Sequence, residues 1–159
     1  MACATVLILG SMPGRESLAR KRYYAHPRNA FWPIMGGLFN LSDCSYEEKT
    51  RELAGKGVAV WDVLQACYRS GSLDARIDEK SIVSNDFNSF FAIHSEISRV
   101  FFNGAKAESV YRRHVLPGLE PAWAGLPLKR LPSTSPAYAA MSLEKKAKAW
   151  KEIRNMGLE

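Results

Sequence analysis

Short predicted strands that alternate with helical segments constrain the fold of this chain more than any other sequence feature. Strands are predicted at residues 5–9, 58–61, 97–102 and 128–131, the first two as apolar runs that polar residues or Gly follow. Short apolar runs are typical of strands buried on both faces, and strands that alternate with helices pair in parallel through right-handed crossovers. The pattern predicts an α/β fold, a three-layer α/β/α sandwich around a small, mainly parallel four-stranded sheet.

Helical spacing of apolar residues predicts helices at 31–39, 46–54, 86–94, 105–115 and 143–156. Ser45 and Glu48 form a capping box, Ser142 occupies an N-cap position, and Asp86 or Asn85 caps the helix at 86–94. Segments 65–81 and 117–127 lack a clean period, so the first is expected as loop or short helical turns and the second as loop. The last helix is expected to turn five residues toward the core: Leu143, Ala147, Trp150, Ile153 and Met156.

Length and composition favour one domain over residues 1–159, because a chain of this size with 47% hydrophobic residues buries a sufficient core. The three cysteines, Cys3, Cys44 and Cys67, are widely separated, which favours ordinary thiols in a reducing compartment over disulfides or a metal site. The first apolar run is too short for a signal peptide or a membrane span. A cytoplasmic monomer without metal, cofactor or membrane contact is expected.

Polar residues gather where the predicted strands end. Gly10 and Ser11 follow the first strand, Asp62 the second, Asn103 the third, and residues 133–135 the fourth. Ligands of such folds bind at the carboxyl ends of parallel strands, so these groups are expected to line one crevice. Two simpler interpretations stay open, since Asp62 could cap a helix and Asn103, which precedes Gly, could form a turn.

The stretch from residue 9 to 32 is read as a long loop and as the active site, because connections of this length are uncommon unless they bind something. It contains two adjacent tyrosines, a His and an Asn. Its basic residues, Arg15, Arg20, Lys21, Arg22 and Arg28, oppose only Glu16. Together with a net charge of +6, this cluster favours a polyanionic partner.

Five motifs together resemble the uracil-DNA glycosylase superfamily, and within it most closely the branch of DNA-deoxyinosine (hypoxanthine-DNA) glycosylases. They are GSMPG at 10–14, YYAHPRNAFW at 23–32, WDVL at 61–64, FNGAKA at 102–107 and LPSTSPA at 131–137. They occur in the family's order and span nearly the whole chain. GSMPG alone is unspecific, whereas HPRNAFW in the same loop and STSPA near the end make the resemblance specific.

Two departures from the better-known branches of that family matter. Met12 occupies the place of an Asp or Asn that positions the attacking water, and a thioether cannot do this. The resemblance to the hypoxanthine branch implies Asn29 as the catalytic residue. Ser133 replaces the His of the late motif, which faces a carbonyl oxygen of uracil, and this favours a purine lesion.

The chemistry assigns further residues. Breaking an N-glycosidic bond requires a placed water, support for the leaving base and exclusion of solvent. Asn29 is expected to accept a hydrogen bond from the water, and Phe31, or else Tyr23 or Tyr24, to stack on the base. The remaining base-binding candidates are Gly10, Ser11, Asp62 and Asn103. The DNA-binding candidates are Arg15, Lys21, Arg22, Arg28, Ser133, Ser135 and Tyr138, and either Tyr138 or Ala139 could enter the duplex as a wedge.

The function that follows from the resemblance is a monofunctional DNA glycosylase that excises hypoxanthine from double- or single-stranded DNA and leaves an abasic site. No Lys is placed as a nucleophile, so lyase activity is not expected, and three scattered cysteines do not match the four that hold an iron–sulfur cluster in some branches. Two alternatives stay open: a glycosylase for uracil or mismatched thymine, and a non-catalytic module that binds damaged DNA.

Overall fold

The computed structural model describes residues 3–43 and 45–155, except for the side chains of Arg15 and Asn155. Its centre is a four-stranded sheet in the order β2-β1-β5-β6. The strands are β1 (Val6–Gly10), β2 (Val58–Asp62), β5 (Arg99–Asn103) and β6 (Leu128–Leu131), and every neighbouring pair is parallel. All five residues of β1 are buried, as expected of a strand covered on both faces. The predicted sheet is confirmed.

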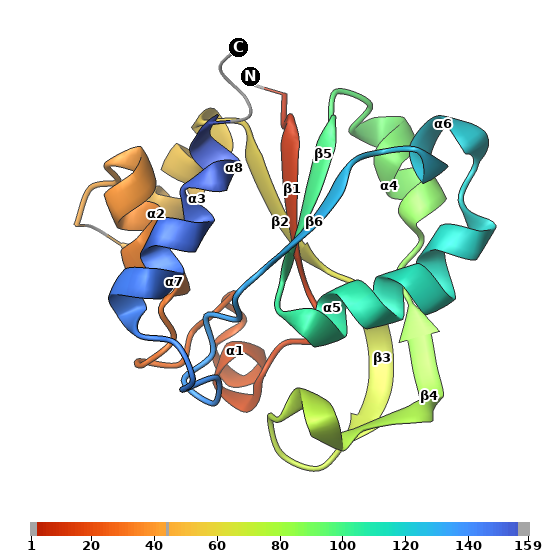
Figure 1. Ribbon diagram of the computed structural model, residues 1–159, viewed down its shortest axis with the longest axis horizontal. Coiled ribbons are helices and arrows are strands. Elements are labelled where there is room, and N and C mark those ends of the chain that lie inside the picture. The colour runs from red at the N-terminus through yellow and green to blue at the C-terminus, as the bar shows by residue number, and fades with distance from the viewer. Residues whose placement is uncertain (1–2, 44, 156–159) are drawn as a thin grey trace.

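Helices cover both faces of the sheet, which confirms the three-layer sandwich (Figure 1). On one face lie α2 (Phe31–Phe39), α3 (Tyr46–Gly55), α7 (Leu143–Trp150) and α8 (Glu152–Asn155), and their buried side chains include Phe31, Leu53 and Trp150. On the other face lie α4 (Phe87–Ile93), α5 (Ala105–Val110), a π-helical turn η2 (Tyr111–Val115), a 3-10 turn η3 (Leu116–Gly118) and α6 (Pro121–Ala124). No helix in the described ranges is long and apolar enough to cross a membrane.

The predicted helix caps form. Ser45 Oγ accepts a hydrogen bond from the Glu48 N–H at 3.3 Å, and the Asp86 and Ser142 side chains make the equivalent contacts for α4 and α7. One core assignment was wrong: Leu143, in the first turn of α7, is 56% exposed, whereas Ala147, Trp150 and Ile153 pack against the core. Met156, also expected in the core, lies outside the described residues.

The expectation for residues 65–81 was wrong. They lie within an antiparallel hairpin of β3 (Leu64–Arg69) and β4 (Ile77–Ser84), whose tip carries the 3-10 turn η1 (Asp74–Arg76). The register shifts between Leu64 and Ala66 and again between Ala66 and Tyr68. Such bulges break the two-residue alternation by which a strand is recognised in sequence.

Two further loops contain helices. The stretch from 9 to 32 includes α1 (Arg15–Arg20), and the segment 117–127 includes the single turn α6. Helix α1 is too short for its spacing to be distinctive. It ends at Lys21, which adopts a left-handed conformation with φ of 54°.

Candidate active site

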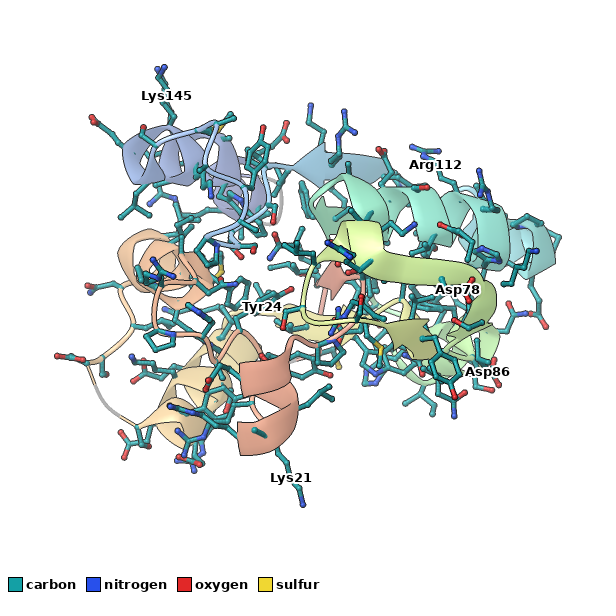
Figure 2. All side chains as sticks on the ribbon, turned by 90° about the horizontal axis from the view of Figure 1, so that it is seen from below. Lys21, Tyr24, Asp78, Asp86, Arg112 and Lys145 are labelled. Carbon is teal, nitrogen blue, oxygen red and sulfur yellow. The ribbon has the colours of Figure 1, made fainter. Side chains whose placement is uncertain are left out.

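A cavity of about 920 Å³ opens at the carboxyl end of the sheet. Its walls come from residues 10–17, 23–29, 72–75, 103–109 and 133–138, together with Asp62. The third range is the tip of the β3–β4 hairpin, which had no predicted role. Figure 2 looks onto this end of the molecule and shows Tyr24 near its centre. The volume lies within the range of about 300 to 1,000 Å³ that is usual for small-molecule sites.

The cavity brings together most of the residues predicted for the site, namely Gly10, Ser11, Asn29, Asp62, Asn103, Ser133, Ser135 and Tyr138. Phe31, Lys21, Arg22 and Arg28 do not line it. The Arg15 side chain lies outside the described part of the chain.

The loop that carries Asn29 is held by hydrogen bonds to its backbone. Tyr46 accepts one from the Tyr23 N–H through its hydroxyl, and Trp32 Nε1 donates one to the Tyr23 carbonyl, both at 2.9 Å. Ser17 of α1 accepts another from the Ala25 N–H at 3.1 Å. Since these anchors come from α1, α2 and α3, the loop is fixed before any ligand is present.

Asn29 ends a tight turn and faces the cavity. Its N–H donates to the His26 carbonyl, and its Oδ1 accepts from the Phe31 N–H, both at 2.9 Å. The His26 ring is also used within this turn, because Nδ1 accepts from the Arg28 N–H at 3.1 Å. The bond to Phe31 fixes Oδ1, and an amide oxygen has a second lone pair. Asn29 therefore keeps one directed acceptor and an amide donor for a ligand.

Tyr24 and its neighbour Tyr23 line the cavity, whereas Phe31 does not. Phe31 is 0% exposed, and its ring centroid lies 4.1 Å from that of Tyr24 at an interplanar angle of 30°. Tyr24 adopts φ of 56°, a conformation that is costly for a bulky residue and is found where a site requires it. Burial first, and the Asp62 carboxylate second, raise the pKa of the Tyr24 hydroxyl.

Gly10 and Asp62 lie opposite each other at the ends of β1 and β2. A Cβ atom at Gly10 would lie 2.7 Å from Asp62 Oδ1 and 3.1 Å from the Tyr24 hydroxyl, so only glycine leaves this point open. Asp62 is 7% exposed. Burial, and then the Asp74 carboxylate, raise the pKa of Asp62 to about 7 against a smaller opposing effect of Arg69.

The hairpin tip is tied to the loop after β1. Ser11 Oγ donates to Asp74 Oδ1 at 2.6 Å. Arg69 donates to the carbonyls of Pro13 at 2.5 Å and Gly71 at 2.9 Å. The sequence identified neither Asp74 nor Arg69, because their roles depend on a hairpin that it did not reveal.

Asn103 is committed to the loop after β6. Its Nδ2 donates to Thr134 Oγ1 and its Oδ1 accepts from the Thr134 N–H, each at 2.9 Å. Thr134 in turn accepts from the Ala30 N–H through its carbonyl, at 2.9 Å. Gly104, with φ of 97°, lets Ser133 approach the backbone here. Thr134, predicted only as part of the polar group at 133–135, thus ties the loop of Asn29 to Asn103 at the end of β5.

A statistical model of the uracil DNA glycosylase superfamily matches residues 2–156. The chain belongs to this superfamily. It is 34% identical over 150 residues to a protein of Methanosarcina acetivorans named hypoxanthine DNA glycosylase, covering 93% of this chain and 89% of that protein. A Methanosarcina barkeri protein of the same name is 34% identical over 104 residues, 64% of this chain and 65% of that protein.

A solved structure resembles this fold closely. It is a solution NMR structure from Methanosarcina acetivorans, provisionally described as a uracil DNA glycosylase. The two superpose with a TM-score of 0.76 at 34% identity, over 96% of this chain and 90% of that chain.

In this member of the uracil DNA glycosylase superfamily, Met12 lines the cavity and packs against the core. The position where better-known branches keep a polar residue for the water is therefore apolar here. Asn29, in the loop that follows α1, lines the same cavity.

A second, smaller crevice of about 410 Å³ lies on the other side of the Asn29 loop, with Arg20, Arg22 and Lys49 in its walls. We call it the basic crevice. Arg22 is partly committed, since it lies 3.5 Å from Glu47 Oε1 and over the ring of Tyr46. Because exposed ion pairs such as Arg22–Glu47 are weak, the Arg22 guanidinium can still bind a phosphate. Lys21 points away from the molecule in Figure 2.

Among the described residues, no cluster of three or more His, Cys, Asp or Glu side chains is arranged to hold a metal ion.

Proposed function

We propose that this protein is a DNA glycosylase that turns a deaminated base, above all hypoxanthine, out of DNA and hydrolyses its N-glycosidic bond. The observation that carries the proposal is the meeting of Asn29, Tyr24 and Asp62 in one cavity at the carboxyl end of the sheet. Membership of the superfamily and the two relatives named hypoxanthine DNA glycosylase support it.

The flipped base stacks on Tyr24, whose ring is supported from behind by Phe31. Stacking on an aromatic side chain contributes about 1 to 3 kcal/mol per base. Flipping costs a few kcal/mol, and less for a badly paired base such as hypoxanthine, so this one contact offsets much of the cost. Phe31 then acts through Tyr24 and does not itself touch the base.

Asn29 places the attacking water by accepting its hydrogen bond at Oδ1, which the Phe31 N–H holds in position. As the bond from C1′ to the base nitrogen breaks, its electron pair goes to the base and positive charge develops on the sugar. The water oxygen then bonds to C1′ and releases a proton. Gly10 and Ser11 shape the wall beside the base, and Asn103 supports the site by holding the loop at Thr134.

DNA approaches across the rim of the cavity. Tyr138, 40% exposed on that rim, fills the gap left by the flipped base, while Ser133 and Ser135 contact the backbone phosphates. Arg22 and its neighbours in the basic crevice bind phosphates on the adjoining side, and Lys21, Arg28 and Arg15 extend this surface. We propose that one domain over residues 1–159 does this as a monomer in the cytoplasm, on double- or single-stranded DNA.

The proposal is tested on labelled duplexes that carry deoxyinosine, uracil or a thymine mismatch, incubated with protein and then cleaved with alkali at abasic sites. The deoxyinosine strand is expected to be cut fastest. Asn29→Ala is expected to lower the excision rate by about 100-fold or more, the usual range for loss of a group that places or activates a nucleophile.

Asn40→Gly is the matched control, because Asn40 is exposed, has a left-handed φ of 54° that glycine accepts, and lies outside the cavity. Undiminished cleavage by Asn29→Ala would remove the catalytic assignment. Faster cleavage of uracil or thymine strands would assign the other substrate class, and binding without cleavage of any strand would indicate a non-catalytic module.

A further inference from the structure

Asp62 directs an unbonded carboxyl group into the cavity. Asp62 is the last residue of β2, lines the cavity and is 7% exposed. Its Oδ1 lies next to the space that a side chain at position 10 would occupy. Its backbone carbonyl accepts a hydrogen bond from Asn85 Nδ2 at 2.8 Å. Within the described residues no donor is hydrogen-bonded to its carboxyl oxygens, and no cation forms an ion pair with it. A buried carboxyl without such partners is favoured in its neutral, protonated form.

The groups around Asp62 favour that neutral form. From the hairpin tip comes Asp74, a second carboxylate, which the Ser11 hydroxyl keeps in place at 2.6 Å. Arg69 of β3 acts in the opposite direction, and its Nε and Nη2 donate to the carbonyls of Gly71 and Pro13. Tyr23 and Tyr24 face it from the loop, and neither carries charge near neutral pH because burial raises the pKa of both hydroxyls.

Hypoxanthine can use such an acid, and uracil cannot use it in the same way. A purine bound to the sugar through N9 has a free lone pair on N7, in the same five-membered ring. When N7 is protonated, the base leaves as a neutral molecule instead of an anion, which lowers the charge that the site must support. Uracil bound through N1 has no second ring nitrogen with a free lone pair.

We propose that Asp62 is the general acid of the reaction, giving its proton to N7 of the flipped purine; this rests on the proposed hypoxanthine excision. The C1′–N9 bond breaks with its electron pair moving into the base, N7 takes the proton from the Asp62 carboxyl, and neutral hypoxanthine departs. The water that attacks C1′ loses one proton to the Asp62 carboxylate, directly or through solvent, and this restores the acid form of Asp62. Asp74 is a positioning residue, because its like charge keeps Asp62 protonated.

The test measures single-turnover excision of deoxyinosine from about pH 5.5 to pH 9 with the wild type and Asp62→Asn. The wild-type rate is expected to fall as the pH rises through neutrality. Asp62→Asn, whose amide cannot transfer a proton, is expected to be at least about tenfold slower at low pH and independent of pH. Uracil has no N7 to protonate, so at low pH its excision is expected to slow less in Asp62→Asn than excision of deoxyinosine does. Asp43→Asn, an exposed carboxyl outside the cavity, is the control and should match the wild type.

Two further measurements separate chemistry from folding. On 7-deaza-deoxyinosine, which lacks the N7 acceptor, wild type and Asp62→Asn are expected to be equally slow and to bind the duplex within threefold of each other. In Asp74→Asn, the excision rate is expected to fall at a lower pH than in the wild type. A wild type that excises no deoxyinosine at any pH removes the proposed function itself. If the wild type excises deoxyinosine and Asp62→Asn keeps both the rate and the pH dependence, only the general-acid role of Asp62 is refuted.

Discussion

Replacing Asp62 by Asn is expected to stabilise the protein at alkaline pH. The fold raises the pKa of this carboxyl from an ordinary 3.8 to about 7, so the folded state holds the proton more tightly than the unfolded state. Stability from this group is then fully present below the unfolded pKa and is lost as the pH rises through the folded value. At 1.36 kcal/mol per pKa unit, the total loss is about 4 kcal/mol, of which about 3 kcal/mol falls between about pH 5 and pH 8.5.

The assay is urea unfolding followed by circular dichroism at about pH 5 and pH 8.5, with wild type, Asp62→Asn and the exposed control Asp43→Asn. The wild type and the control should lose stability between these pH values by about 3 kcal/mol more than Asp62→Asn does. The amide is close in shape to the carboxyl, so packing is retained. Equal pH dependence in wild type and Asp62→Asn would refute the reasoning, because Asp62 would then be ionised in the folded protein at no cost.

Three other substitutions test the geometry of the cavity. Gly10→Ala introduces a methyl group 2.7 Å from Asp62 Oδ1 and should cost about 1 to 3 kcal/mol of stability in urea unfolding, with a parallel loss of excision. Thr134→Val removes the acceptor of Asn103 Nδ2 and should cost about 1 to 3 kcal/mol, while a loss below this range would mean that the bond is not formed. Tyr24→Phe removes a buried hydroxyl without a hydrogen-bond partner among the described residues, so thermal unfolding should show unchanged or slightly higher stability and stacking should persist.

The sheet and the place of the cavity could be predicted because both are encoded locally. The run 5–9 is apolar throughout, and the caps at Ser45 and Asp86 need only residues three positions apart. Once the strands are parallel, their carboxyl ends must share one edge, which brings Gly10, Asp62 and Asn103 together. None of these steps requires knowledge of side-chain packing.

Which aromatic ring faces the cavity could not be predicted in this way. The sequence offered Phe31 and the pair Tyr23 and Tyr24, all within nine residues. Phe31 is the first member of an apolar stripe that continues through Ile34, Met35 and Leu38, and that stripe was the available signal for a core position. The left-handed backbone of Tyr24, which turns its ring into the cavity, has no local cause and is imposed by the anchors on either side.

Two of the elements that the sequence misread, α1 and the β3–β4 hairpin, form walls of the cavity, and the reason is physical. Neither has a strong pattern of its own, and side-chain contacts with the loops of the site hold both: Ser17 binds the Ala25 N–H, Asp74 binds Ser11, and Arg69 binds the Pro13 carbonyl. Sequence reasoning is expected to fail where tertiary contacts at a functional site override local preference. Because these contacts form within the protein, folding bears the entropy cost of ordering the walls, and DNA meets a cavity that is already shaped for the flipped base.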